Sequence, residues 1–546
     1  MSVIALLAGL ALGAPAEAAD QVQTITRDGV VLQYDRVATP PVKLRPRMKA
    51  NWVTRSDFDG DGIDDIAAMG DPFNYTLPKT PTGVVTVRYS AVPQVDYFLG
   101  VLGSTGGCGC FGTALVAGDF NGDRYDDLAI GDQDEVDPRN GLHAGGVWVI
   151  PGSSRGLVVD SARHFNQSSP GVPDDAEDYD WFAGALAAGD INGDGRDDLA
   201  IGAHGESVGS KTEAGAVTVL FGGSAGLTAT GAQYFTQDQS AVPGVSESND
   251  HFGYTLAIGK VNGDRYADLV IGAPQEDDST AWNGSGLVTL MWGSATGVSS
   301  TGATSVTGAA LRGAMGQAEN YAWYLGEALA IGDVNGDGLG EVIAGAPSAQ
   351  TPEITGGLIA VFTGRSGGLS SSAVRVITQR TSGVPGEPAA GDRFGAALAA
   401  GDVTGDGKAD VLVGAPGDRV GTAAEAGSVT LLKGSTAGLT GSGAQAFDQS
   451  QSAVPNTAER GDKFGASVAL LNLNGGLDAV VAAPGEEVAG DLAGYPSGSV
   501  TRFYGSKGGL VPHPVTVTGL GLRSDHVWPQ RYGLRIAGPQ SGGPLY

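Results

Sequence analysis

Short apolar runs alternate with acidic or glycine-rich turns along most of the chain. One unit begins with an apolar run at residues 182–189, crosses an acidic turn and resumes at 199–203. Two further runs follow at 217–221 and 232–236. Runs of this length, bounded by turn residues and without helical periodicity, are typical of β-strands. Each unit therefore predicts four antiparallel strands, named A to D here in chain order.

The unit occurs seven times. Its acidic turn starts at intervals of 62 to 73 residues, at Asp57, Asp119, Asp190, Lys260, Asp333, Asp402 and Asn472. Four antiparallel strands in about 70 residues make one blade of a β-propeller, and closing the ring leaves few free sheet edges. The predicted fold is all-β, a seven-bladed β-propeller. Its 90 glycines among 546 residues agree with many tight turns.

The pattern also divides the chain. We expect a signal peptide at 1–18, an N-terminal segment at 19–40, the propeller at 41–520 and a C-terminal tail at 521–546. Three segments are candidates for closing the ring on the last blade: residues 22–26, 30–34 and 515–518. The sequence does not choose among them.

The acidic turn has the spacing of a calcium loop, D-x-[DN]-G-D-x-x-x-D. Side-chain oxygens at positions 1, 3, 5 and 9 and a backbone carbonyl at position 7 would surround a hard cation, and Ca²⁺ takes six to eight oxygens. An EF-hand loop begins similarly but needs Glu at position 12. That position is Ile130 in the second copy and Ile201 in the third. Both lie in strand-like runs, which favours a β-hairpin loop.

Five copies carry a complete ligand set and predict about five structural Ca²⁺ ions. The fourth copy starts with Lys260, whose ammonium could take the place of the cation beside Asp264 and Asp268, and the seventh lacks the acid at position 5, so both should be vacant. The expected metal-binding residues are Asp57, Asp59, Asp61, Ile63 and Asp65; Asp119, Asn121, Asp123, Tyr125 and Asp127; Asp190, Asn192, Asp194, Arg196 and Asp198; Asp333, Asn335, Asp337, Leu339 and Glu341; and Asp402, Thr404, Asp406, Lys408 and Asp410.

Two motifs flanking the loop carry a family resemblance. A Phe-Gly pair precedes the loop and Gly-Ala-Pro follows it, as in Phe252-Gly253 with 272–274 and Phe394-Gly395 with 414–416. The chain resembles FG-GAP repeat proteins, among them the integrin α-subunit headpiece. This resemblance implies a seven-bladed propeller with calcium in its A–B loops, and adhesion or ligand binding. The first copy lacks Phe-Gly, and no leg domains follow, so we do not expect a complete integrin-like receptor.

The net charge and the N-terminal residues indicate which partners and which location to expect for the protein. A net charge of −28 argues against nucleic acid and anionic membranes as partners. An apolar run at residues 3–12, followed by Ala16 and Ala18, reads as a secretory signal, although its start carries no Lys or Arg. No later run of about 18 apolar residues predicts a membrane span. We expect a secreted, extracellular monomer.

Long B–C loops and D–A connections should share the face opposite the calcium loops. Loops on a rigid scaffold commonly carry function, and we expect an extracellular protein or glycan ligand there, near Trp282, Asn283 and Tyr495. The alternative is a polysaccharide- or ester-cleaving enzyme. Three G-x-S-x-G strings, at Ser154, Ser224 and Ser366, resemble a nucleophile elbow. All three fall in C–D turns, so we expect no catalytic residues.

Overall fold

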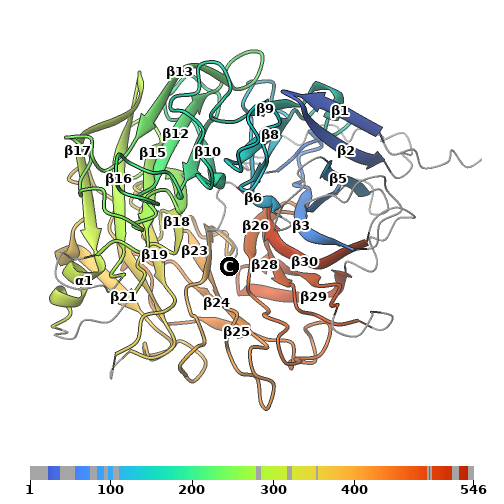
Figure 1. Ribbon diagram of the computed structural model, residues 1–546. Coiled ribbons are helices and arrows are strands. Elements are labelled where there is room, and N and C mark those ends of the chain that lie inside the picture. The colour runs from blue at the N-terminus through green and yellow to red at the C-terminus, as the bar shows by residue number, and fades with distance from the viewer. Residues whose placement is uncertain are drawn as a thin grey trace, which may run out of the picture.

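The seven predicted blades are present and form a ring in the computed structural model (Figure 1). The structure describes residues 23–36, 56–73, 83–90, 96–102, 110–277, 284–316, 323–351, 354–488, 491, 495–518 and 528–538. Six blades are four-stranded antiparallel sheets with their strands in chain order. The fold is therefore the seven-bladed β-propeller that the repeats predict.

The strands of blades 2 to 7 follow the A to D order. Blade 2 holds β6 (Phe111–Gly118), β7 (Asp127–Asp132), β8 (Gly146–Ile150) and β9 (Arg163–Phe165); blade 3 holds β10 (Phe182–Gly189), β11 (Asp198–Ala203), β12 (Ala216–Phe221) and β13 (Thr228–Phe235). Blade 4 holds β14 (Thr255–Gly259), β15 (Asp268–Ala273), β16 (Leu287–Ser294) and β17 (Gly297–Thr307); blade 5 holds β18 (Ala328–Gly332), β19 (Glu341–Ala346), β20 (Leu358–Phe362) and β21 (Val374–Ile377). Blade 6 holds β22 (Ala397–Gly401), β23 (Asp410–Ala415), β24 (Ser428–Leu432) and β25 (Gln445–Phe447); blade 7 holds β26 (Val468–Asn472), β27 (Leu477–Ala483), β28 (Ser499–Ser506) and β29 (Gly509–Thr518).

Blade 1 is assembled from both ends of the described chain. Its order is β1 (Gln23–Arg27), β2 (Val30–Arg36), β5 (Asp96–Leu102), β4 (Val84–Arg88), β3 (Ile66–Phe73) and β30 (Trp528–Ile536). Strand β30 pairs antiparallel with β3 and takes the innermost A position, as Figure 1 shows beside the ring centre. It therefore closes the ring.

This closure differs from the three candidates named from the sequence. Strands β1 and β2 add to the outer edge of the same blade, beyond β5, and β29 is strand D of blade 7. The closing strand lies in the segment assigned to a C-terminal tail. Its Tyr532-Gly533 pair stands where the other blades have Phe-Gly: Tyr532 is 1% exposed and bridges to Gly498 of blade 7. The Phe-Gly missing from the first copy is thus supplied from the far end of the chain.

The core lies between the blades. The repeated aromatic residue at the start of strand A is fully buried at Phe111, Phe182, Phe252, Phe394 and Phe464. Each interface also brings two backbones together, as where Gly427 bridges to Phe464. A Cβ on Gly427 would lie 2.2 Å from the Phe464 carbonyl oxygen, so only glycine fits. The many glycines therefore permit close blade packing as well as turns.

Within the described ranges, helical structure is confined to short pieces between strands. The helix α1 (Gly308–Ala314) follows β17, and η1 (Val159–Ser161) and η2 (Ser371–Ala373) are single 3₁₀ turns. The sequence predicts no helix here. Thr307 caps α1 by accepting a hydrogen bond from Ala310 N at 3.0 Å, and this local cap outweighs the weak periodicity of so short a segment.

Candidate metal loops and central cavity

Four of the five complete acidic loops join strands A and B as predicted, in blades 2, 3, 5 and 6. The first loop, at 57–65, precedes strand B of blade 1 (β3) but does not join it to strand A, because β30 comes from the far end of the chain. In the third, Asp190 accepts hydrogen bonds from Asp194 N and Gly195 N, both at 3.0 Å, and Asn192 accepts from Asp194 N at 2.9 Å. The residue at position 7, Arg196, donates its N–H to Asp194 at 3.0 Å. These turns curl the backbone around its own side-chain oxygens.

The first loop gathers the most carboxylates. Asp57, Asp59 and Asp61 each place an oxygen within 4.8 Å of the others, and all three side chains are buried. Oδ2 of Asp59 is buried and makes no hydrogen bond. An orphaned buried carboxylate oxygen is costly unless a cation satisfies it. The residues of this loop therefore fit a hard divalent cation, and the position-9 acid Asp65 is also fully buried.

Position 9 of the loop has a second role in every blade. Each of these acids accepts a hydrogen bond from a backbone N–H near the end of strand C, as Asp127 does from Gly152 N at 2.8 Å. It commonly also accepts from position 2, as Asp127 does from Phe120 N at 3.2 Å. The seven pairs of acceptor acid and backbone donor are Asp65 with Ser90, Asp127 with Gly152, Asp198 with Gly222, Asp268 with Gly293, Glu341 with Gly364, Asp410 with Gly434, and Asp478 with Gly505.

Burial and clustering raise the pKa of several acids in these loops. Burial raises the pKa of Asp57 to about 7 and that of Asp59 to about 6, and neighbouring carboxylates add to both shifts. Burial likewise raises the pKa of Asp127 to about 8 and that of Asp198 to about 7. Among the described residues, Arg196 pairs with Asp194 and Lys408 with Asp406, but no Lys or Arg forms an ion pair with Asp57, Asp59, Asp127 or Asp198. A bound cation would reverse the shifts of these four acids.

The two incomplete loops keep the fold of the others. Lys260 is exposed and forms no ion pair with Asp264 or Asp268. The prediction that its ammonium takes the place of a cation is therefore wrong. A long, strongly hydrated side chain remains in water because it gains little from a half-exposed loop. In the seventh loop, Asn472 accepts from Gly475 N at 2.8 Å and closes the shortened turn.

A cavity of about 700 Å³ opens at the centre of the ring, on the face of the B–C loops and D–A connections. Its lining includes the ends of strands B, as at Pro416 and Pro484, and the residues before strands A, as at Arg393 and Lys463. Five lining residues are Arg or Lys and three are Asp or Glu. The sign of the net charge of this lining is therefore opposite to that of the whole chain, whose net charge is −28.

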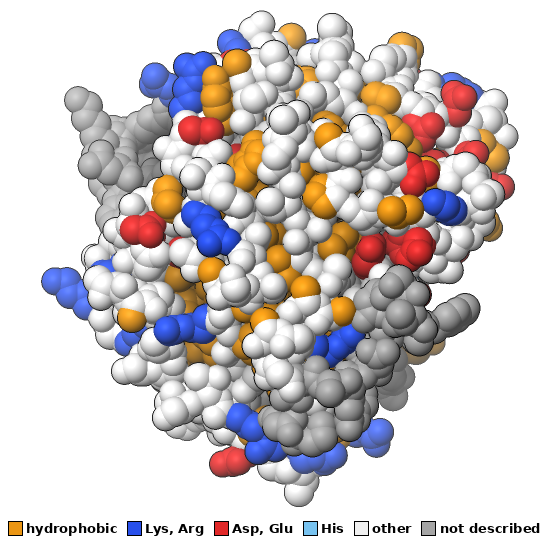
Figure 2. Space-filling view, turned by 90° about the vertical axis from the view of Figure 1, so that its left-hand side faces the viewer, with side chains coloured by type: hydrophobic (Ala, Val, Ile, Leu, Met, Phe, Trp, Pro, Cys, Tyr) orange, Lys and Arg blue, Asp and Glu red, His pale blue; other side chains and the backbone are white. Residues whose placement is uncertain are grey.

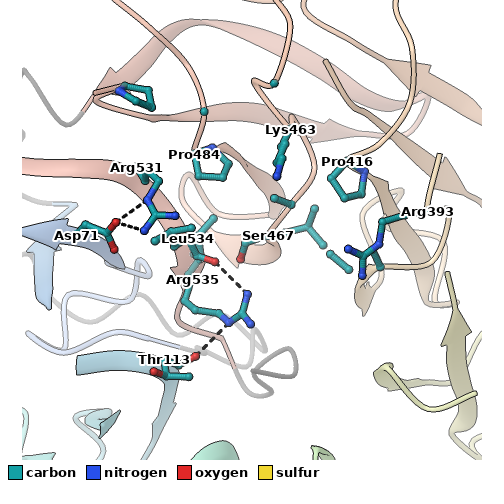
Figure 3. Close-up of a pocket in the computed structure, with 18 of the residues that line it drawn as sticks. Asp71, Thr113, Arg393, Pro416, Lys463, Ser467, Pro484, Arg531, Leu534 and Arg535 are labelled. Atoms are coloured by element: carbon teal, nitrogen blue, oxygen red, sulfur yellow. Dashed lines mark hydrogen bonds and ion pairs between the residues drawn. The ribbon is translucent and has the colours of Figure 1, made fainter. Parts of the chain in front are cut away.

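The basic side chains reach the cavity from several blades (Figure 3). Arg531 pairs with Asp71 across the closing strand, and Arg393 pairs with Glu327. Arg535 is buried and donates to the carbonyl oxygens of Thr113 at 3.0 Å and Leu534 at 3.1 Å. Burial lowers its pKa to about 10, so it stays charged at neutral pH. Lys463 pairs with Glu425 at 3.9 Å, so three of the five basic lining residues lie in ion pairs and the lining keeps an excess of two basic over acidic residues.

The rest of the expected ligand face is only partly described. Tyr495 is half exposed in the B–C loop of blade 7, whereas Trp282 and Asn283 lie outside the described residues.

Figure 2 shows the side of the ring, where apolar side chains are scattered and a group of acidic ones lies toward the right-hand edge. No sequence signal marked the basic cavity, because its residues come from separate repeats.

The three G-x-S-x-G strings form tight turns between strands C and D. Gly156 N donates to Ser153 O at 2.8 Å, Gly226 N to Gly223 O at 2.7 Å, and Gly368 N to Arg365 O at 3.2 Å. A nucleophile elbow joins a strand to a helix, and none of these turns does so. The turn interpretation made from the sequence is confirmed.

Comparisons with known proteins agree with this geometry. The FG-GAP repeat profile matches residues 111–150, 182–220, 252–291, 325–361 and 394–432. Bovine (Bos taurus) phosphatidylinositol-glycan-specific phospholipase D is 28% identical over 72% of this chain and 45% of its own length. The human enzyme of that name is 32% identical over 34% of this chain and 21% of its own, and integrin alpha-PS2 of Drosophila melanogaster is 31% identical over 34% and 12%.

This chain therefore spans less than half the length of these relatives. Among solved structures, the rhamnogalacturonan lyase PL11 of Bacillus licheniformis aligns with 91% of this chain and 75% of its own at 11% identity, with a TM-score of 0.32 that carries no argument. Within the part of the chain that the structure describes, no helix is long and apolar enough to cross a membrane. With its five matched repeats and seven-bladed ring, the chain is an FG-GAP repeat protein that resembles the integrin α propeller.

Proposed function

We propose that this protein is a secreted, calcium-binding propeller that holds an extracellular protein or glycan on the face of its B–C loops and D–A connections. The observation that carries the proposal is the basic central cavity on that face. In a chain of net charge −28, a local excess of Arg and Lys selects anionic groups such as carboxylates or sulfates. Secretion rests on the signal-like segment at 1–18, which lies outside the described residues.

In this proposal calcium stabilises the fold and takes no part in ligand binding. The A–B loops lie at the opposite end of the strands from the cavity, so an ion there would neutralise the clustered acids and hold the ring without touching the ligand. The matched repeats occur both in a phospholipase and in an integrin α-subunit. A module shared by proteins with such different names favours a binding role for the repeats themselves.

The test compares two charge reversals of equal size. Lys463→Glu places an acid at the cavity, where the lysine side chain is 54% exposed. Lys507→Glu makes the same change in an exposed C–D turn on the opposite face. Binding of an immobilised acidic polysaccharide, in calcium and at fixed salt, should weaken severalfold in the first variant and stay unchanged in the second. Equal binding by both would overturn the assignment to the cavity.

A second candidate is a hydrolase, and the relatives named phosphatidylinositol-glycan-specific phospholipase D favour it. Release of a glycosylphosphatidylinositol-anchored protein from membranes by the purified chain would support it. If the purified chain releases no anchored protein in the time that phospholipase D needs to release all of it from the same sample, the binding role remains.

A further inference from the structure

A second group of acidic side chains lies on the ligand face, away from the A–B loops. Glu177, Asp180 and Glu206 each place a carboxylate oxygen within 4.8 Å of the others. Glu177 and Asp180 belong to the connection between blades 2 and 3, and Glu206 belongs to the B–C loop of blade 3. Asp180 is 1% exposed and Glu206 is 2% exposed, whereas Glu177 faces solvent. The cluster is thus open on one side.

The backbone holds these carboxylates in place. Asp180 Oδ2 accepts a hydrogen bond from Glu177 N at 2.6 Å, which fixes the turn that carries both residues. Glu206 N donates to Ala203 O at 3.1 Å, and Glu206 O accepts from Gly215 N at 2.9 Å. The two loops are therefore ordered before any ligand arrives, which lowers the entropy cost of binding.

A buried amide points at the same place. Gln167 is only 4% exposed, and its Nε2 donates to Glu206 Oε2 at 2.7 Å. The same amide also lies within hydrogen-bonding reach of Asp180. Its Oε1 is buried and has no hydrogen-bond partner. A half-turn of the amide would exchange the two atoms and present Oε1 to the cluster as a further oxygen ligand.

The negative charge of the cluster lacks a protein counter-ion. Among the described residues, no Lys, Arg or His forms an ion pair with Glu177, Asp180 or Glu206. Asp174 approaches Glu206 and adds further negative charge. Ionised buried carboxylates without a counter-ion are costly, and a bound cation would satisfy them.

The same residue types recur at equivalent places in blades 4 and 7. In blade 4, Glu247 N donates to Asp250 Oδ2 and Gln237 Nε2 donates to Glu276 Oε2. In blade 7, Glu459 and Gln449 make the matching bonds to Asp462 and Glu486. Their glutamine Oε1 atoms are also without partners. Across the described ranges, however, the blade 3 copy alone brings its three carboxylates within 4.8 Å.

We propose that Glu177, Asp180 and Glu206, with the Gln167 amide oxygen, bind a divalent cation of the calcium class on the ligand face. Three carboxylates and an amide are hard oxygen ligands, and the open side leaves room for water or a ligand oxygen to complete six to eight positions. This site is separate from the A–B loops and does not depend on the proposed function.

The test uses anomalous diffraction from crystals of the full chain grown in calcium. Glu177→Ala removes one ligand without disturbing the buried pair, because the Glu177 side chain is exposed. Glu247→Ala makes the same change at the equivalent exposed position of blade 4. We expect a calcium peak between Glu177, Asp180 and Glu206 in the wild type and in Glu247→Ala, and none in Glu177→Ala. Equilibrium dialysis should then show one ion fewer in Glu177→Ala than in Glu247→Ala.

No peak at this position in the wild type would overturn the proposal. So would a peak of undiminished height in Glu177→Ala, or its loss in Glu247→Ala. Peaks in the A–B loops are read separately from their positions, so a failure of the loop assignment cannot be mistaken for a failure here.

Discussion

Asp57 of blade 1 and Asp126 of blade 2 are joined by two hydrogen bonds across the blade boundary. Asp57 N donates to Asp126 Oδ2 at 2.8 Å, and Asp126 N donates to Asp57 O at 3.1 Å. Asp126 stands at position 8 of its loop, just before the position-9 acid. The same pair of bonds joins Asn472 to Asp64 at 2.7 Å each, and Asp119 to Asp197 at 3.0 Å each.

Bonds of this kind join neighbouring loops around the ring from the seventh through the first to the sixth. Where position 8 is Ala267, Gly340 or Ala409, the backbone bond to the preceding loop remains and the carboxylate bond is lost. Position 8 thus serves the blade interface, whereas positions 1, 3 and 5 face the expected ion.

The first prediction concerns this interface. Asp126→Ala should lower the free energy of unfolding by about 1–3 kcal/mol, because Asp57 N loses its buried acceptor. Burial holds the pKa of Asp126 well above its usual range, so Asp126→Asn, which keeps an acceptor oxygen, should lose less. Denaturant unfolding of the two variants measures the difference. An alanine variant as stable as wild type would contradict the role.

Ring closure by β30 gives the second prediction. Tyr532→Ala should lower the free energy of unfolding by about 3–5 kcal/mol, since it empties a fully buried site between blades 7 and 1. Tyr179→Ala is the control, because Tyr179 is 55% exposed, and it should change stability by about 0.5 kcal/mol. Equal effects of the two substitutions in thermal or denaturant unfolding would show that β30 does not close the ring.

The third prediction separates metal binding from structure at position 9. Asp268 is fully buried in a loop that starts with Lys260, so we expect no ion there. Asp268→Ala should still lower the free energy of unfolding by about 2–4 kcal/mol, because Val261 N and Gly293 N lose their acceptor. Asp264→Ala, at the exposed position 5 of the same loop, should cost about 0.5 kcal/mol.

Both of these losses should be the same with calcium and with chelator. A loss for Asp268→Ala that appears only when calcium is present would mean that the fourth loop holds an ion after all.

The fourth prediction is a pH dependence that calcium removes. In the folded protein without calcium, burial raises the pKa of Asp57 to about 7 and that of Asp127 to about 8, above the ordinary carboxyl value near 4. Between those values the folded state binds more protons than the unfolded state. Stability in chelator should therefore fall as pH rises from about 4 to about 8.

Bound calcium would hold the same carboxylates ionised, so its addition should raise the melting temperature and flatten this slope. Scanning calorimetry at several pH values, with calcium or with chelator, measures both effects. A chelated protein that becomes more stable over this range would contradict the account.

The sequence was informative where the structure repeats a local pattern. Seven loops at regular intervals predicted seven blades, and Asp57, Asp59 and Asp61 come together because loop geometry depends on neighbouring residues. The sequence did not predict contacts between residues that come together only when the ring closes. Tyr532-Gly533 resembles the Phe-Gly pairs and is followed by a similar apolar run, a signal that could have identified the closing strand. Asp71, Arg393 and Lys463 meet at the cavity from three blades, and no spacing records that.

The most direct test of the binding account is to incubate the mature chain with acidic polysaccharides in calcium and to measure retention and polymer length in the same sample. The account predicts that the protein is retained and that polymer length stays constant over hours. Progressive shortening of the polymer would contradict it, because the protein would then be an enzyme.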